Sequence, residues 1–141
     1  MRLSRLLALV VIVAAMTALA GCGDDSSPTS PSGPTATQTF RGTLTTNGAA
    51  THTFVSNTSG TVTATLNTLT TESGALAPAV GISLGTFALN SCAAAVSNDL
   101  AFSGTVITGS VAGAVSLCVR VYDAAGRITE PVSYSITVAY P

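Results

Sequence analysis

One histidine and four widely separated carboxylates, all within residues 39–141, are the side chains most suited to acid–base chemistry. His52 is the only histidine, and a Ser–His–Asp hydrolase would use it as the general base. Two carboxylates could hydrolyse a glycosidic bond if the fold brought them within about 5–10 Å. We expect no Gly-x-Ser-x-Gly nucleophile elbow, a structural role for the histidine and turn positions for the acids, so the chain is predicted not to be an enzyme. The four acids are Glu72, Asp99, Asp123 and Glu130.

Tyr122 and Arg120 are the best candidates for recognising a ligand. Both fall on outward-facing positions of one predicted strand, and the simpler interpretation, which we favour, is that the pair only covers a sheet face. The chain has no lysine and therefore lacks the basic patch of nucleic-acid-binding proteins. We expect no metal and no cofactor, because His52 lies far from the cysteines in sequence, no Cys-x-x-Cys occurs and no glycine-rich loop precedes a helix.

Residues 1–21 have the three parts of a secretory signal peptide. Arg2 and Arg5 form a positive n-region, and an apolar run over 6–18 follows them. This run is shorter than the roughly 20 residues that a membrane-spanning helix needs. An ordinary cleaved signal and an uncleaved anchor are the alternatives to what its last residues indicate.

The last four residues of this region, Leu19-Ala20-Gly21-Cys22, resemble a bacterial lipobox. The resemblance covers residues 1–22 and implies diacylglycerol on the Cys22 thiol, cleavage before Cys22 and acylation of the new amino terminus. Acyl chains, worth about 0.8 kcal/mol per buried CH₂, would hold the protein on a membrane. Gly23, where inner-membrane lipoproteins have aspartate, favours the outer membrane, although Asp24 and Asp25 weaken this inference. We therefore expect a lipid-anchored protein of the bacterial cell envelope, facing the periplasm or the cell surface.

If Cys22 carries lipid, Cys92 and Cys118 remain as an even pair in an oxidising compartment. Such a pair is expected to form a disulfide, with two buried free thiols as the alternative. The two residues are 26 positions apart, and the loop-entropy model assigns such a bridge about 3.5 kcal/mol. Because Cys118 falls on the outward side of its strand, the bridge is predicted to attach an alanine-rich edge to a sheet without crossing the core.

Residues 22–38 are predicted to be a disordered tether between the lipid and the folded domain. Serine, proline, threonine and glycine dominate this segment, and so polar a stretch cannot bury enough surface to offset its ordering entropy. Its prolines favour the polyproline II conformation, in which the tether would reach about 50 Å. The remaining residues, 39–141, are predicted to form a single domain.

From Thr39 onward the hydrophobic pattern repeats every two residues, which predicts strands. Asn47-Gly48 between two such runs is the strongest hairpin signal, and residues 88–96 are ambiguous between a short strand and one helical turn. Seven or eight short strands with regular turns predict a single all-β, antiparallel sandwich. The clearest inward-facing sets are Val62, Ala64 and Leu66; Val80, Ile82 and Leu84; Leu117, Val119 and Val121; and Val132, Tyr134, Ile136 and Val138, with Phe40, Phe54, Phe87 and Phe102 also expected in the core.

Five segments of the domain resemble the bacterial pre-peptidase C-terminal domain. They are residues 40–44 (FRGTL), 52–55 (HTFV), 59–66 (SGTVTATL), 119–122 (VRVY) and 134–138 (YSITV). The resemblance covers about residues 38–140 and implies a jelly-roll-like β-sandwich with no catalysis of its own, some relatives of which bind polymers such as collagen or polysaccharide. This chain differs from the family pattern in having Leu117-Cys118 where aromatic residues are frequent, and in its Cys92–Cys118 pair.

Together these patterns predict a non-enzymatic, membrane-anchored lipoprotein that acts as a binding or structural module at the cell envelope. Its partners would be the lipid membrane, through acylated Cys22, and an envelope protein or polysaccharide. One alternative is a surface glycan- or polymer-binding module, which needs an exposed aromatic groove. The other is a His52-dependent hydrolase, which needs a carboxylate and a hydroxyl within hydrogen-bonding reach of the imidazole.

Overall fold

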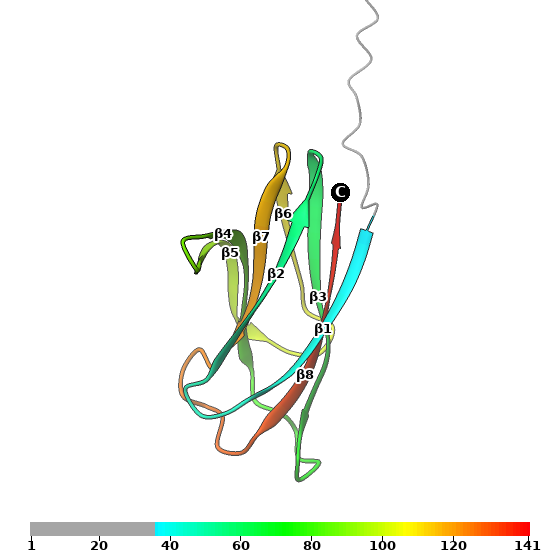
Figure 1. Cartoon of the computed structure of the whole chain (residues 1–141). Helices are drawn as coiled ribbons and strands as arrows, with labels where there is room; N and C mark the ends of the chain where they lie inside the picture. The colour runs from blue at the N-terminus through cyan, green and yellow to red at the C-terminus, as the bar shows by residue number, and fades with distance from the viewer. Residues whose placement is uncertain (1–35) are drawn as a thin grey trace, which may run out of the picture.

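A computed structural model describes residues 36–141, which form two four-stranded antiparallel sheets packed face to face (Figure 1). One sheet has the strand order β1-β8-β3-β6 and the other has the order β2-β7-β4-β5. The predicted all-β antiparallel sandwich is therefore confirmed. The strands are β1 Ala36–Leu44, β2 Ala49–Ser56, β3 Gly60–Thr71, β4 Val80–Ala88, β5 Ser91–Ala101, β6 Val106–Val111, β7 Val115–Tyr122 and β8 Val132–Tyr140.

The chain crosses between the two sheets at nearly every connection. Each pair of consecutive strands from β1 to β8 is divided between the sheets, except that β4 and β5 are hydrogen-bonded neighbours in one sheet. This strand order is that of a jelly roll, the double Greek key that the sequence led us to expect. Within residues 36–141 the β4–β5 connection is consequently the only hairpin.

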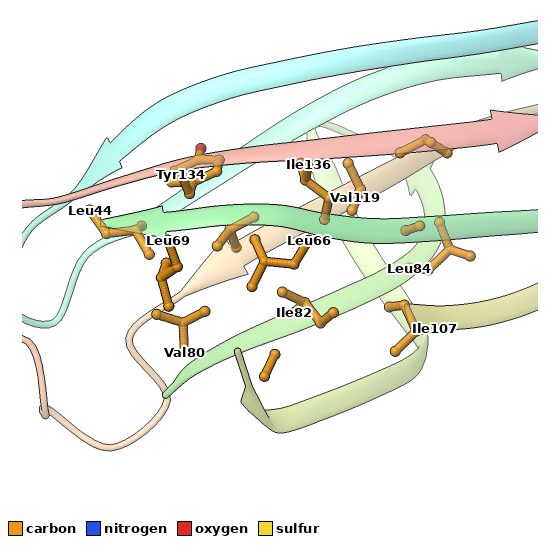
Figure 2. Close-up of a cluster of buried hydrophobic side chains, with 14 of the residues drawn as sticks. Leu44, Leu66, Leu69, Val80, Ile82, Leu84, Ile107, Val119, Tyr134 and Ile136 are labelled. Carbon is orange, nitrogen blue, oxygen red and sulfur yellow. The ribbon is translucent and has the colours of Figure 1, made fainter. Parts of the chain in front are cut away.

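The inward-facing residues of both sheets meet in one hydrophobic core, part of which Figure 2 shows. Alternation places apolar side chains inside and threonine or serine outside, because successive residues of a strand point to opposite faces. The four clearest inward sets predicted from the sequence are all buried. The largest fully buried side chains are Leu44, Leu66, Ile82, Ile128, Ile136, Val62, Val80, Val119, Val121, Val132 and Val138.

The Asn47-Gly48 turn is present, but it is not a hairpin. The Gly48 N–H donates to the Thr45 carbonyl at 2.8 Å, and Asn47 has a φ of 56°. β1 pairs with β8 and β2 pairs with β7, so the strands on either side of the turn enter different sheets. Asp123 holds this corner in place: its carboxylate accepts the Asn47 N–H at 3.0 Å, and its N–H donates to the Gly48 carbonyl at 2.9 Å.

The structure decides one open alternative and corrects two local expectations. Residues 88–96 form the β4–β5 turn and the first part of β5, with no helical turn. Phe102 is 50% exposed because it lies in the turn after β5. Phe87 is only half-buried because it lies next to the hairpin turn at the end of β4. β1 begins at Ala36 and so includes residues that we assigned to the tether.

The signal peptide, Cys22 and most of the predicted tether lie outside the described residues, which begin at Ala36. Between Ala36 and Pro141, no helix has the length and apolar character needed to cross a bilayer.

Candidate partner-binding hairpin

The tip of the β4–β5 hairpin carries an exposed leucine in a backbone conformation that leucine disfavours. Its two loop residues, Leu89 and Asn90, have φ angles of 51° and 58°. Two-residue loops with positive φ at both positions suit the twist of a hairpin and are usually built from Asn, Asp or Gly. Asn90 fits this preference, whereas a left-handed conformation at leucine costs about 1–2 kcal/mol.

Nothing inside the domain compensates for the leucine at this position. The Leu89 side chain is 99% exposed, so it contributes no burial to the core. A residue held in an unfavourable conformation without a packing benefit is a common sign of function. In Figure 1 the β4–β5 hairpin also stands out from the side of the sandwich. Leu89 is therefore the centre of the candidate site.

The hairpin is tied down at its base by a disulfide. Cys92 of β5 and Cys118 of β7 are bonded, with their Cα atoms 5.8 Å apart. β4 lies between these two strands in the sheet, so the disulfide spans β4. Gly85 of β4 lies at this point and pairs with Cys118. A Cβ atom at Gly85 would lie 2.0 Å from the Ala93 carbonyl oxygen, so only glycine permits this approach. The predicted disulfide is confirmed, and it joins an edge strand to its own sheet, as expected.

A second link between β7 and β5, a hydrogen bond, spans β4 farther from the hairpin tip. Tyr122 of β7 lies over Gly81, where a Cβ atom would be 2.3 Å from the tyrosine ring, and its hydroxyl donates to the Asp99 carboxylate of β5. Burial and this contact with Asp99 raise the pKa of Tyr122 to about 12. Both ties fix the edge strand β5, so the hairpin is presented as a preorganised element.

A polar notch of about 330 Å³ lies beside the hairpin tip. Arg120 is its only charged residue, and its guanidinium carbon lies over the Tyr122 ring, 5.3 Å from the ring centroid. The two residues of the predicted binding pair therefore differ. Tyr122 is half-buried and hydrogen-bonded to Asp99, whereas Arg120 is exposed and free to contact a ligand. The notch is lined by Ala49, Thr51, Asn90, Ser91, Cys92 and Arg120.

His52 lies elsewhere, in an aromatic cluster between β1, β2 and β8. Its ring stacks on Phe40 with centroids 4.7 Å apart, and its Nε2 atom is hydrogen-bonded to the Tyr134 hydroxyl at 2.8 Å. Burial lowers the pKa of His52. Among residues 36–141 no carboxylate is hydrogen-bonded to this histidine, so the arrangement that a hydrolase would require is not assembled.

The expectation that no Gly-x-Ser-x-Gly motif occurs is wrong, because residues 81–85 (GISLG) match it. The structure shows why the match carries no nucleophile. The segment lies within β4 and not at a strand-to-helix turn, and Ser83 is 3% exposed. Ser83 pairs with Arg120 on the outward face of its sheet, whereas His52 faces inward beside Phe54.

The four carboxylates are dispersed as the sequence suggested. Asp123 closes a turn, where desolvation acts to raise its pKa but N–H donors, including those of Asn47 and Arg127, outweigh it and lower the pKa. Glu130 accepts a hydrogen bond from the Ser73 hydroxyl at 2.7 Å, and Glu72 is exposed in the loop after β3. No group of three or more His, Cys, Asp or Glu residues suited to a metal occurs in the part of the chain from Ala36 to Pro141.

A second hollow, of about 540 Å³, opens between the edge strands β5 and β6. Gly109 leaves room there, since a Cβ atom would approach Leu84 to 3.3 Å and Val96 to 4.0 Å. Threonine and serine line its rim, and no titratable side chain lines it. It is an apolar extension of the core and offers no chemistry of its own.

Sequence reasoning did not identify Leu89. Leu-Asn is not a recognised hairpin signal, and Leu89 continues the apolar run that begins at Phe87. The strands end at Ala88 and resume at Ser91, but residues 87–96 (FALNSCAAAV) do not alternate between apolar and polar side chains. The two-residue gap that predicts a tight hairpin therefore could not be seen in the sequence.

No family model matches this sequence, and neither does any curated protein. A comparison with solved structures finds similarity to PliG of Aeromonas hydrophila, a periplasmic lysozyme inhibitor of g-type lysozyme. The TM-score is 0.51 at 18% sequence identity, and the match covers 73% of this chain and 84% of that chain. At this level of identity the similarity concerns the fold, and it agrees with a single sandwich domain.

Proposed function

We propose that this protein is a lipid-anchored module of the bacterial envelope that binds another protein through the β4–β5 hairpin. The observation that carries the proposal is Leu89, which is 99% exposed in a left-handed conformation. Inserting a leucine side chain into an apolar pocket contributes about 1.5–3 kcal/mol. This gain, available only in a complex, is as large as the conformational cost at the turn or larger.

The preorganisation of the hairpin also supports protein binding. Association loses free energy when flexible loops must be ordered, and a loop already held in its bound conformation avoids much of that loss. The Cys92–Cys118 bond and the Tyr122–Asp99 hydrogen bond hold β5 from two points. A rigid hairpin with an apolar tip is suited to enter a depression on a partner.

The similarity to PliG suggests a class of partner. PliG is described as a periplasmic inhibitor of g-type lysozyme, and we propose that this chain likewise binds an enzyme that enters the envelope. Cys22 would fix the module to the membrane, and residues 23–35 would hold it away from the surface. A g-type lysozyme is therefore the first purified partner to test, by calorimetric titration and by residual lysozyme activity.

The glycan-binding alternative is weaker. It requires an exposed aromatic platform, and the two tyrosines nearest to that role are half-buried. Tyr122 covers Gly81, and Tyr140 packs against Phe54 with ring centroids 4.9 Å apart. Each ring is thus in contact with another part of the domain and is not displayed as an open platform.

Leu89→Asn tests the proposal because it separates folding from binding. Asparagine tolerates the left-handed turn, so we expect stability to be unchanged or raised by up to about 1 kcal/mol. Binding should weaken at least tenfold, since the apolar contact is lost. Leu76→Asn is the matched control, because Leu76 is 95% exposed in the loop before β4, at the other end of that strand.

The partner need not be known in advance. A photo-crosslinking amino acid at position 89 of the full-length protein, expressed in its own cells, should capture a specific protein that the same amino acid at position 76 does not. The captured protein, once purified, should then bind wild type and Leu76→Asn equally. Equal capture from both positions would contradict a binding role for the hairpin.

A further inference from the structure

We infer that the notch beside the hairpin tip is an anion site in which Arg120 binds a carboxylate of the partner protein. This inference rests on the proposed function and adds the chemistry of the recognised group. It predicts a partner surface with an apolar depression for Leu89 and an acidic side chain next to it.

The first argument is the charge of the notch. Arg120 is its only charged lining residue, and the others are neutral: Ala49, Thr51, Asn90, Ser91 and the disulfide-bonded Cys92. The nearby acid, Asp99 of β5, does not line the notch and already accepts a hydrogen bond from the Tyr122 hydroxyl. An exposed guanidinium with no acid in its pocket is an electrostatic complement for an incoming anion.

The second argument is the orientation of the guanidinium. The guanidinium carbon lies over the Tyr122 ring, 5.3 Å from its centroid, and this cation–π contact restricts where the group can move. A guanidinium held in this way can present its parallel N–H donors to both oxygens of a carboxylate, which a lysine ammonium cannot do. Thr51, Asn90 and Ser91 surround it with neutral hydrogen-bonding groups.

The third argument is position. Asn90 follows Leu89 directly in the turn and also lines the notch that holds Arg120. One partner surface that takes up Leu89 therefore passes over the notch. Apolar insertion would supply affinity, and the carboxylate would fix orientation, because charge pairs contribute strongly to specificity.

The probes for the experiment are two acetylated dipeptide amides, leucyl-aspartate and leucyl-asparagine, which differ in the negative charge alone. Each is titrated into the full-length protein in detergent micelles, and NMR follows the backbone N–H groups of Asn90 and Ser91 and the Arg120 Nε–H. We expect saturable shifts of these signals with the aspartyl peptide, at an apparent affinity at least tenfold tighter than with the asparaginyl peptide.

Arg120→Gln should abolish the difference between the two peptides, and Arg120→Lys should reduce it at least fivefold because the charge remains but the fork is lost. Arg127→Gln, in the loop after β7, is the control and should leave the difference intact. Equal shifts with both peptides, or an equal response of the Arg127 Nε–H, would overturn the inference.

The outcomes distinguish this inference from the proposed function. If position 89 still captures its partner and the peptides do not discriminate, only the carboxylate site is wrong. If the peptides discriminate but Leu89→Asn binds the partner as wild type does, only the role of the hairpin tip is wrong.

Discussion

Tyrosines laid over glycines recur in this domain and connect strands that are not neighbours. Tyr134 lies over Gly42 of β1, where a Cβ atom would be 2.5 Å from its hydroxyl oxygen, and that hydroxyl reaches His52 in the opposite sheet. Tyr122 lies over Gly81 in the same manner and reaches Asp99. In both cases the missing side chain gives the ring a flat surface, a known means of supporting glycine within a sheet.

Gly85→Ala should destabilise the domain more than an ordinary glycine substitution. The added methyl group would meet the backbone of Ala93, and the disulfide at Cys92 prevents β5 from moving away. We expect a loss of about 1–3 kcal/mol in the free energy of unfolding, as for overpacked cores, measured by urea denaturation. Gly113→Ala, where nothing lies within 4 Å of the new atom, should change stability by less than about 0.5 kcal/mol. Equal effects at the two positions would refute the close approach.

His52 should make stability depend on pH as the pH falls below about 7. Burial lowers its pKa below the ordinary value of 6.5, so the unfolded chain takes up the proton more readily than the folded one. The free energy of unfolding is then fully present above pH 6.5 and falls as the pH drops toward the folded-state value. Denaturation of wild type and His52→Gln across this range should show a shallower slope in the variant. Parallel slopes would mean that the imidazole titrates alike in both states.

At the scale of elements, the β4–β5 hairpin is held by two cross-links, the Cys92–Cys118 disulfide and the Tyr122–Asp99 hydrogen bond, and not by neighbouring strands on both edges. β5 is an edge strand with β4 as its only neighbour in the sheet, and its side chains are largely exposed. Edge strands of this kind open readily. The disulfide and the Tyr122–Asp99 hydrogen bond attach β5 to β7 and so keep this edge strand from opening.

Replacing both cysteines, Cys92→Ala with Cys118→Ala, should lower the free energy of unfolding by about 3.5 kcal/mol. Hydrogen exchange should accelerate most over residues 86–95, because β5 loses its attachment to β7 there, whereas β3 and β8 stay protected. The comparison is with wild type under the same non-reducing conditions. Uniform acceleration throughout the sandwich would show that the bridge acts on global stability alone.

Strand positions could be predicted from the sequence far better than strand partners. In β3 and β8 the alternation of apolar residues with threonine or serine fixes which side faces inward, because the period of two is local. The Asn47-Gly48 corner was misread because a turn signal does not say which sheet the next strand joins. The carboxylate that holds the corner belongs to Asp123, 76 residues farther along the chain. Likewise, the sequence indicated that Cys118 lies on the outward face of its strand. It did not indicate that the backbone of Ala93 packs directly against Gly85.

At the scale of the whole molecule, the sandwich was predictable and the site was not. Phe102 illustrates the limit, since an apolar residue in an alternating run is normally buried, yet it falls in a turn and is half exposed. Leu89 was missed for the related reason that its significance lies in its backbone angle and its exposure. The resemblance to the pre-peptidase C-terminal domain stays a prediction, although its implied jelly roll agrees with the strand order.

Cys22→Ala tests the membrane attachment of the whole molecule. If Cys22 carries the lipid, the variant should lose palmitate labelling completely and move from the membrane to the soluble fraction or accumulate with its signal uncleaved. The reason is that membrane affinity would come from the acyl chains. Ser27→Ala, in the same segment, should be labelled and fractionated as wild type. Unchanged membrane association of Cys22→Ala would remove the anchor from the proposal.

The pairing of Ala36 with Tyr140 places the first residue of β1 against the end of β8 (Figure 1). This has a mechanical consequence. A pull on the preceding segment, directed away from the sheet, meets the β1–β8 ladder at its end, so the hydrogen-bonded pairs would open one after another, as in a zipper. Releasing the nine residues of β1 would lengthen the chain by about 30 Å. The opposite sheet, cross-linked between β5 and β7, would keep the hairpin in position meanwhile. Under tension, β1 would thus detach from β8 before the contact between the hairpin tip and its partner is disturbed.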